Sequence, residues 1–542
     1  MFRGSARIIL SCLFVLGSQT ENAQDNVGED STVVYPANYF NEWTPVTAQD
    51  MLDRIPGLSG GGSSYSGVAG ASRSYRSGGG RGFGGGSRGT EILINGKRTA
   101  GKNNSTGGQL TRITSDQVDY IEIIRGTSGE LDVRGSGQVI NVILYDTFAD
   151  RSIQYELSAQ QSDNNTVTPS GSLSFSGQTG ALDYQIEARS GEVYSRNITK
   201  ENSVLGDFSP NDRIREIRQT DGDNSTISAN AGYEISPSSS ARFNAQFTEG
   251  SGESDTVRRT TDLKVSPNVD FFQREDNPSS IENWEIGADY EYVTDRGDRF
   301  KVLAISNAFT QARTRERWNL TSPQSEDKNL FLDSGSITRE RIIRGSYTFD
   351  MFGGSQDIEL GAERAQTILD SKLALGIGGI PGTPSSDFGG LVPVSISNSN
   401  SSVEEMRYEP FVIHNWIFSP RMSLETSVLY EDSEITQRGD VSKSRDFDFV
   451  KPKADFRYDL TPQIQLRGTI EKIVEQLTFN DFVAATDNRD EDSNVQLGNE
   501  NLRQEWYWNY EFNAEYRLPN DIGVVSSRLY FEDWHDRIER ID

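Results

Sequence analysis

From about residue 149 onward, apolar and polar residues alternate in segments of roughly ten residues, separated by residues typical of turns. One pair of segments illustrates the pattern: Leu173 and Phe175 precede a turn at residues 177–180, and Leu182 and Ile186 follow it with even spacing. Side chains of a β-strand point alternately to the two faces of its sheet, so a period of two predicts strands with one apolar face. We therefore expect antiparallel β-hairpins throughout this part of the chain.

The connections between these strands are expected to alternate between short and long. Short turns are predicted at residues 177–180, 237–240, 294–298, 351–355, 418–421, 459–463 and 518–521. Long connections of about 30 residues are predicted around residues 189–224 and 248–281, with comparable stretches before residues 341, 404 and 504. Outer-membrane β-barrels have this asymmetry of short periplasmic turns and long extracellular loops. A soluble all-β fold, which seldom has it, is the alternative.

About 15 strands are expected between residues 152 and 536. Bacterial barrels have an even number of strands, because an unclosed edge would leave backbone groups unpaired in the membrane. An odd number therefore indicates either a miscount or a chain that lacks its last strands. Aromatic residues recur near the strand ends, where amphipathic rings suit a membrane–water interface: Trp284, Tyr290, Tyr292, Trp416, Phe418, Trp506, Tyr507, Trp508, Tyr516, Tyr530 and Trp534.

The chain before residue 149 has a different pattern. Short apolar segments at residues 33–36, 91–98, 119–126 and 131–144 are typical of short strands, and residues 47–55 and 110–118 are helical candidates. Thr47 is placed to cap the first helix, and the Pro56-Gly57 pair ends it. Asn95-Gly96 is a turn signal. The pattern predicts a compact α+β domain at residues 33–148, followed by the β-sheet domain at residues 149–542.

The N-terminus has the features of a secretory signal. Arg3 and Arg7 precede about ten mostly apolar residues, and Ala23 is a plausible cleavage position. We expect residues 1–23 to be a signal peptide and residues 24–32 to be a periplasmic segment. A lipoprotein signal at Cys12 is the alternative, although few apolar residues precede this cysteine. Elsewhere no run of about 18 apolar residues could span a bilayer as a helix, so a membrane-spanning chain would cross as strands.

Acidic residues outnumber basic ones by 80 to 53, which gives a formal charge of −27. This balance repels nucleic acid. Acidic segments at residues 207–223 and 481–492 are interpreted as solvated loops, with binding of cationic ligands or divalent ions as the alternative. Cys12 is the only cysteine, so the mature chain would contain no disulfide and no thiolate metal site.

Signals for catalysis or cofactor binding are weak. The glycine-rich residues 57–89 lack the lysine and the following helix of a phosphate-binding loop. The two histidines, His414 and His535, lie far apart in sequence within predicted strands, which does not favour a zinc or Ser/His/Asp hydrolase. We expect no enzyme activity, no cofactor and no metal site.

Several motifs, taken in order, resemble the plug domain of TonB-dependent receptors. They are the patterns LxxIPGL at residues 52–58, RGFGGG at 81–86, ILINGKR at 92–98, L.RI…QVDYIEIIRG at 110–126 and G.GQVINVIL at 135–144. Residues 452–462 and 498–505 resemble late barrel signatures, except that Glu500 and Gln504 stand where that family usually has prolines. The resemblance implies a plug inside a 22-stranded barrel. With about 15 strands present, it also implies a chain truncated by about seven strands.

The resemblance also implies roles for particular residues. Arg125 and Arg134 match arginines that form ion pairs with barrel carboxylates in that family, with ligand contact as the alternative. An extended segment near the mature N-terminus, the TonB box, pairs there with the periplasmic protein TonB. Thr32, Val33 and Val34 are the candidates, and they are equally interpreted as the first plug strand. Candidate ligand-facing residues of the glycine-rich loop are Tyr65, Arg73, Tyr75, Arg76 and Arg81; a flexible, solvated loop is the other interpretation.

The function implied by the resemblance is TonB-dependent uptake across the outer membrane of a Gram-negative bacterium, driven by the proton-motive force of the inner membrane. The expected partners are TonB with its energising complex, outer-membrane lipid and a small-molecule or oligosaccharide substrate, without nucleic acid. Siderophore-bound iron, cobalamin and oligosaccharides all fit as substrates. A passive channel, a structural surface protein and a nonfunctional barrel fragment are the alternatives.

Overall fold

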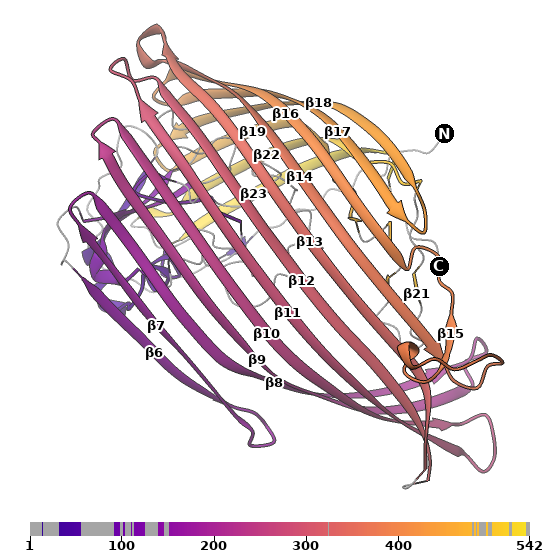
Figure 1. Ribbon diagram of the computed structural model, residues 1–542. Helices are drawn as coiled ribbons and strands as arrows, with labels where there is room; N and C mark the ends of the chain where they lie inside the picture. Colours follow the sequence, from indigo (N-terminus) through magenta and orange to yellow (C-terminus); the bar gives the residue numbers. More distant parts are fainter. Residues whose placement is uncertain are drawn as a thin grey trace.

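The computed structural model describes residues 13–14, 32–55, 91–97, 101–102, 110, 113–124, 139–145, 151–322, 325–479, 482–483, 485–486, 495–496, 501–519 and 523–537. They form a small mixed sheet and a large antiparallel sheet that curves around it (Figure 1). In these residues no helix is long and apolar enough to cross a membrane.

The small sheet has the strand order β2-β4-β5-β3, in which only the β3–β5 pair is parallel. Its strands are β2 (Val33–Pro36), β3 (Glu91–Ile94), β4 (Val118–Ile124) and β5 (Val139–Leu144). Three short helices accompany it: η1 (Ala37–Trp43), α1 (Ala48–Leu52) and η2 (Ser115–Gln117). One apolar core joins sheet and helices, with Met51, Ile55, Ile121 and Ile140 fully buried. These elements make a compact α+β unit, hereafter the plug.

Local signals in the plug sequence have the predicted effect. Thr47 caps α1: its hydroxyl accepts the Asp50 N–H at 3.2 Å, and the Asp50 carboxylate accepts the Thr47 N–H at 2.9 Å. Asn95 and Gly96 both have positive φ, 50° and 74°, as a tight turn after β3 requires. A helix was expected at residues 110–118. In the described part of this stretch, the 3₁₀ turn η2 ends at Gln117 and β4 begins at the β-branched Val118, so the helix is shorter than expected.

The large sheet contains fifteen strands of ten or more residues within the described part of the chain. They are β6 (Ser152–Gln161), β7 (Val167–Thr179), β8 (Leu182–Val204), β9 (Pro210–Ser236), β10 (Ser239–Asp262), β11 (Val269–Val293), β12 (Arg299–Ser322), β13 (Ser325–Met351), β14 (Gln356–Ile377), β16 (Asn400–Ser419), β17 (Met422–Gly439), β18 (Lys443–Thr461), β19 (Ile464–Val474), β22 (Trp506–Arg517) and β23 (Val524–His535). Each pairs antiparallel with the next. The predicted fold class and approximate strand number are confirmed.

Four shorter strands complete the description. β15 (Val392–Val394) pairs antiparallel with the end of β14, and β20 (Ala485–Thr486) pairs with β21 (Val495–Gln496). β1 (Leu13–Phe14) lies in the predicted signal peptide and pairs with β23, so cleavage after Ala23 would remove it. Among the described strands β6 pairs with β7 alone, and the sheet is not closed.

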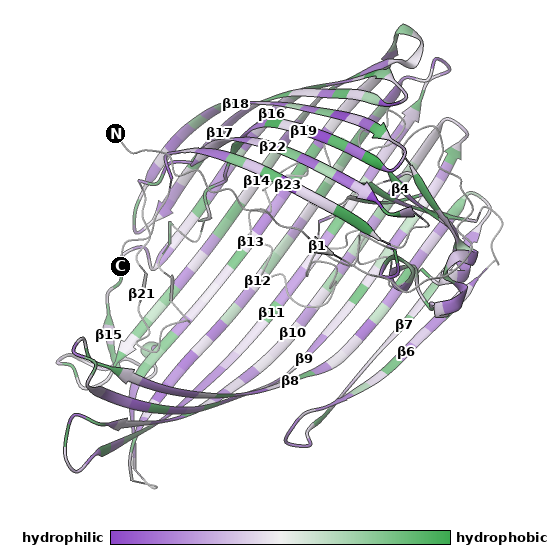
Figure 2. Ribbon diagram, turned by 180° about the vertical axis from the view of Figure 1, so that it is seen from behind, coloured by the Kyte–Doolittle hydropathy of each residue, from purple (hydrophilic) through white to green (hydrophobic). Residues whose placement is uncertain are grey.

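The two faces of the large sheet differ as the period of two predicts. Leu360, Val412 and Val428 are neighbours on adjacent strands and form part of an exposed apolar row on the outer face. Glu359, one residue from Leu360, and Glu425, three residues from Val428, are buried on the inner face. Figure 2 shows this alternation as stripes of opposite hydropathy along each strand. An apolar exterior around a polar interior is the arrangement of a transmembrane barrel.

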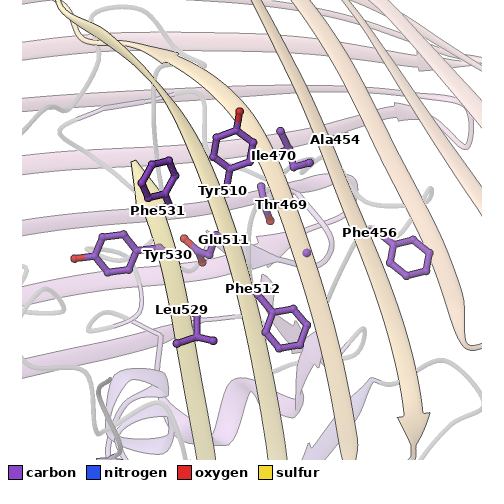
Figure 3. Close-up of a pocket in the computed structure, with 11 residues that line it drawn as sticks. Ala454, Phe456, Thr469, Ile470, Tyr510, Glu511, Phe512, Leu529, Tyr530 and Phe531 are labelled. Carbon is purple, nitrogen blue, oxygen red and sulfur yellow. The ribbon is translucent and has the colours of Figure 1, made fainter. Parts of the chain in front are cut away.

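The apolar exterior is hollowed at Gly468, where a groove of about 590 Å³ crosses β18, β19, β22 and β23 (Figure 3). Its apolar walls include Phe456, Ile470, Phe512 and Leu529. A Cβ atom built on Gly468 would meet no other atom within 4 Å. The groove lies on the outer, membrane-facing side of the sheet and outside the lumen.

The connections were predicted only in part. Short turns occur at all seven predicted places, but three of the five predicted long connections are mostly strand. Between β8 and β9 the chain leaves the sheet only at residues 205–209, and between β10 and β11 only at residues 263–268. β12 and β13 likewise continue through the stretch before residue 341. Residues 378–399 leave the large sheet except at β15, and the described residues of 475–505 leave it as expected.

Candidate functional site

The plug lies inside the curve of the large sheet, near the end where the short turns gather (Figure 1). Lys97, just after the Asn95-Gly96 turn, places its Nζ 2.8 Å from Glu234 Oε1 and 3.2 Å from Ser240 Oγ. These partners flank the short turn between β9 and β10. The strand-and-turn motif at residues 92–98 therefore carries a lysine to the rim of the barrel.

Two further contacts fix the plug at this rim. Arg517, the last residue of β22, donates from Nη1 to the Tyr35 hydroxyl at 2.9 Å, and both residues are buried. Gln117 of the plug donates to Ser176 Oγ of β7 at 3.4 Å. Together with Lys97, these contacts reach β7, β9, β10 and β22. The plug is thus held around much of the barrel end that carries the short turns.

Lys102 makes the deepest described contact between plug and barrel wall. Its backbone N–H lies 3.0 and 3.1 Å from the two Glu285 carboxylate oxygens, and its Nζ lies 2.7 Å from Glu340 Oε2. Glu285 of β11 is 1% exposed and Glu340 of β13 is 6% exposed. Glu285 is eight residues from the end of β11 at Val293, which is roughly 25 Å along the strand. The plug therefore reaches well into the lumen.

The inner wall beyond the plug is lined by charges paired across neighbouring strands. Arg407 donates to Glu363 at 2.9 Å, and both are almost fully buried. Lys451 contacts Glu431 at 3.0 Å and also pairs with Glu409. Burying a charge is costly unless it is paired and hydrogen-bonded. These pairs therefore stiffen a polar wall on β14, β16, β17 and β18.

Part of the connection between β19 and β22 folds into the lumen. Phe482 is fully buried in an apolar cluster that includes Leu369, Val403 and Ile435 of β14, β16 and β17. Gln437 of β17 donates from Nε2 to the Phe482 carbonyl oxygen at 3.1 Å. The sequence indicated only an exposed acidic loop here, because its alternating pattern ends at β19. Most of the acidic residues 481–492 lie outside the described part of the chain.

The structure locates the predicted site residues only in part. Tyr65, Arg73, Tyr75, Arg76 and Arg81, the ligand-facing candidates, lie outside the described residues, as do the ion-pair candidates Arg125 and Arg134. Their roles remain predictions. The described plug–barrel ion pairs come from Lys97 and Lys102, to which sequence reasoning gave no role. The available signal was the position of Lys97 directly after the Asn-Gly turn of the ILINGKR motif.

Val33 and Val34 belong to β2, opposite Ile123 and Glu122 of β4. Thr32 immediately precedes this strand. The two valines therefore lie in a plug strand, which was one of the two interpretations of this segment. Their contact with TonB remains a prediction. In the described sheet β2 is an edge strand, with β4 on one side only.

The histidines lie far apart and in different surroundings. His414 Nε2 is 3.1 Å from Gln356 Oε1, and the His535 ring stacks on Trp506 with centroids 4.0 Å apart. Among the described residues no group of three His, Cys, Asp or Glu side chains is arranged to hold a metal ion.

Comparison with protein families decides the family. Residues 218–542 match the model of the TonB-dependent receptor-like β-barrel, and residues 27–139 match that of the TonB-dependent receptor plug domain. The chain belongs to the TonB-dependent receptor family. Proteins of this family act in the outer membrane of Gram-negative bacteria, and this receptor is located there. The family consists of transport receptors, which work with TonB and bind small-molecule ligands.

Two solved structures of outer-membrane receptors are similar to this chain at low identity. The ferripyoverdine receptor of Pseudomonas aeruginosa is 12% identical, with a TM-score of 0.45 and with 93% of this chain and 62% of that chain covered. The ferric yersiniabactin uptake receptor FyuA of Yersinia pestis is 11% identical, with a TM-score of 0.46 and coverage of 94% and 73%. The chain thus spans less than two thirds of the ferripyoverdine receptor and about three quarters of FyuA. A search of curated protein sequences finds no match.

Proposed function

We propose that this receptor takes up a large or scarce nutrient from outside the cell, with energy delivered by TonB from the inner-membrane proton-motive force. Siderophore-bound iron, cobalamin and oligosaccharides are the proposed substrate classes, and no catalytic step is part of the proposal. The observation that carries the proposal is the plug inside the curved sheet, attached to it by polar contacts of its described residues.

Those contacts suit a plug that moves. Lys97, Lys102, Tyr35 and Gln117 reach the wall through hydrogen bonds and ion pairs, whereas the apolar core of the plug is internal to it. Hydrogen bonds and ion pairs can exchange with water as the plug shifts, because each contributes only about 1 to 3 kcal/mol net. A passive open channel has no need of such a plug.

The edge strand β2 offers a route for the pulling force. An extended segment of a partner can add a strand to an exposed edge through backbone hydrogen bonds. Thr32, Val33 and Val34 lie at this edge, and β2 is hydrogen-bonded to the central strand β4. Tension applied there would be transmitted through β4 to the rest of the plug sheet. We therefore assign the TonB contact to Thr32, Val33 and Val34.

Binding of the purified periplasmic domain of TonB to the full chain in detergent tests the proposal. The variant Thr32→Pro removes a backbone N–H just outside β2, so it leaves the β2–β4 pairing intact while weakening strand addition. We expect the unmodified chain to bind, Thr32→Pro to bind at least about tenfold more weakly, and the control Thr32→Ser to bind normally. Absence of TonB binding to the unmodified chain would argue for a structural surface protein.

A further inference from the structure

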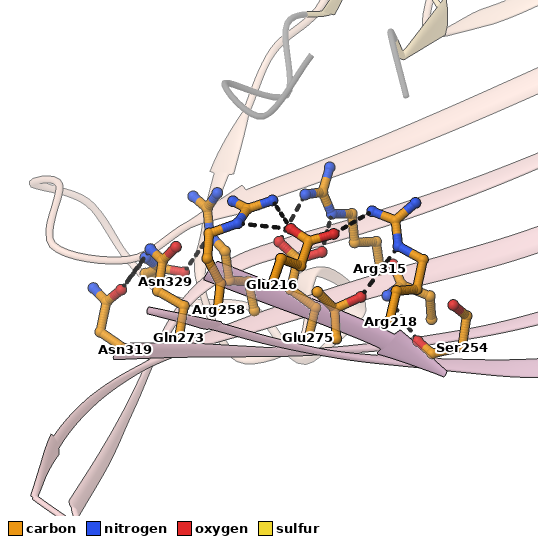
Figure 4. Close-up of polar contacts among 12 residues, drawn as sticks. Glu216, Arg218, Ser254, Arg258, Gln273, Glu275, Arg315, Asn319 and Asn329 are labelled. Atoms are coloured by element: carbon orange, nitrogen blue, oxygen red, sulfur yellow. Dashed lines mark hydrogen bonds and ion pairs between the residues drawn. The ribbon is translucent and has the colours of Figure 1, made fainter. Parts of the chain in front are cut away.

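Five arginines gather on the inner face of β9, β10 and β12, further from the short turns than the contacts of Lys102. Inward-facing and outward-facing positions alternate along each strand. The register places five arginines on inward-facing positions of neighbouring strands: Arg218, Arg258, Arg313, Arg315 and Arg317. Figure 4 shows Arg218, Arg258 and Arg315 of this cluster with their side chains on one side of the sheet. Two carboxylates, Glu216 of β9 and Glu275 of β11, stand among them. Five positive and two negative groups leave a net charge of +3, in a protein whose overall charge is −27.

Each carboxylate is held most closely by one arginine. Arg258 donates to Glu216 Oε2 from Nε at 2.8 Å and from Nη2 at 2.6 Å. Arg315 forms a two-point pair with Glu275, at 2.9 and 2.7 Å. These four residues are at least nine-tenths buried, and they form a rigid charged base for the cluster.

The other three arginines have no carboxylate to themselves. Arg218 Nη2 lies 3.4 Å from Glu216 Oε1, whereas Arg258 Nη2 is closer to this carboxylate, at 2.6 Å from Oε2. Arg317 donates from Nε to the neutral Asn329 Oδ1 at 3.0 Å. For Arg313 no ion pair or side-chain hydrogen bond is found among the described residues. The next inward-facing carboxylates along β9 and β10 are Asp212 and Asp262. Asp212 is four residues from Glu216 and Asp262 is four residues from Arg258, roughly 13 Å along the strand in each case.

The cluster lies on the extracellular side of the membrane. Arg218 is 18 residues from the end of β9 at Ser236, and Arg317 is 18 residues from the start of β12 at Arg299. At about 3.3 Å per residue and a tilt of about 45°, this places them roughly 40 Å above the short turns, whereas the apolar band is about 25 Å tall. The outer face at this level carries charges such as Asp221. Solutes from outside therefore meet this inner wall before they reach the described part of the plug.

An apolar surface adjoins the arginines. Leu332 and Leu330 of β13 stand opposite Arg315 and Arg317 in the register, and they pack with Leu373 of β14. A molecule held by Arg313 and Arg317 would also contact these leucines. The wall thus joins three incompletely balanced cations with an apolar strip.

We propose that Arg218, Arg313 and Arg317 bind the anionic groups of the transported ligand, a small molecule with at least two carboxylate or phosphate groups. Guanidinium groups bind such oxygens in a two-point geometry, and their attraction is strong where water is partly excluded. Arg313 and Arg317 are four residues apart on one strand, and Arg218 lies three strands away, so separate anionic groups engage them. The role in transport rests on the proposed uptake function, whereas the binding itself does not require TonB.

Titration calorimetry of the full chain in neutral detergent, with citrate and pyrophosphate as probes, tests this inference. The double variant Arg313→Gln with Arg317→Gln removes two cations without leaving a carboxylate that depends on them. We expect it to weaken binding at least about tenfold. The control is Arg259→Gln, next to Arg258 in sequence but on the outer face and paired with Asp270 at 2.6 Å. This control is expected to bind as the unmodified chain does.

Two further measurements do not depend on how well the double variant folds. Glu275→Gln raises the net charge of the cluster by one and is expected to tighten binding about tenfold, whereas a role of Glu275 in ligand contact would weaken it. Raising the ionic strength from about 50 to about 500 mM should weaken binding of the unmodified chain. Absence of binding by both probes, or equal loss in Arg259→Gln, would overturn the inference. TonB binding is measured separately, so either proposal can fail alone.

Discussion

Lys102 connects the plug with the barrel wall through its backbone and its side chain at once. Its two partners, Glu285 and Glu340, come from strands that are not neighbours, because β12 lies between β11 and β13. The ammonium group of Lys102 neutralises the buried Glu340 carboxylate, and the backbone N–H of Lys102 donates to the Glu285 carboxylate. The contact spans 238 residues of sequence, so no local pattern could have predicted it.

Replacing Lys102 by methionine keeps the length of the side chain but removes its charge. Glu340 would then lose a charged hydrogen-bond partner, which costs about 2 kcal/mol. We expect Lys102→Met to loosen the plug and to raise amide hydrogen exchange in β3 and β5. The matched control is Lys264→Met, since Lys264 is half exposed in the turn before β11 and 3.7 Å from Asp262. Equal exchange in both variants would show that Lys102 does not hold the plug.

Tyr507 shows how far residue type alone can be interpreted. It stands between Trp506 and Trp508, and the sequence places all three at a membrane interface. The register with β19 turns Tyr507 inward, where it is 1% exposed and its ring lies 4.0 Å from that of Trp534. Three aromatic residues in a row give no alternation, so only the pairing with β19 decides which of them face the lumen.

At the scale of elements, the hairpin turns were predictable and the strand lengths were not. Turn residues such as Pro237 and Gly297 act locally, and the turns occur where they stand. The halves of β9 and β10 furthest from their short turn carry polar residues on both faces, for example Asp221 opposite Glu253 on one face and Thr220 opposite Ser254 on the other. Without an apolar face these halves lack the period of two, although their backbones pair fully. For this reason the sequence predicted long connections in these regions.

The close approach of β9 and β10 in this region can be tested at Gly222. A Cβ atom there would lie 2.3 Å from the backbone oxygen of Ser251, so Gly222→Ala must displace one strand at a cost of about 1 to 3 kcal/mol. We expect faster hydrogen exchange in these halves of β9 and β10. Gly468→Ala is the control, because a Cβ atom there meets open space. Unchanged exchange in Gly222→Ala would contradict the described pairing.

At the scale of the whole molecule, two sheets of different construction serve different tasks. The plug has an apolar core of its own, which includes Phe40 and Ile121, whereas the large sheet keeps its polar groups inside. The sequence predicted this division, because the period of its hydrophobic pattern changes near residue 148. It did not predict the arginine cluster, since Arg218 and Arg317 are brought together only by the register of four strands.

The central claim is that TonB pulls on the plug at Thr32, Val33 and Val34. Cross-linking in living cells tests it most directly, because Cys12 of the predicted signal peptide is the only native cysteine. The account predicts that the full chain with Val34→Cys forms a disulfide-linked product with TonB that carries a single periplasmic cysteine. It also predicts none with Val450→Cys, on the outer face of β18. Absence of the product at Val34, or equal yields at both positions, would contradict the account.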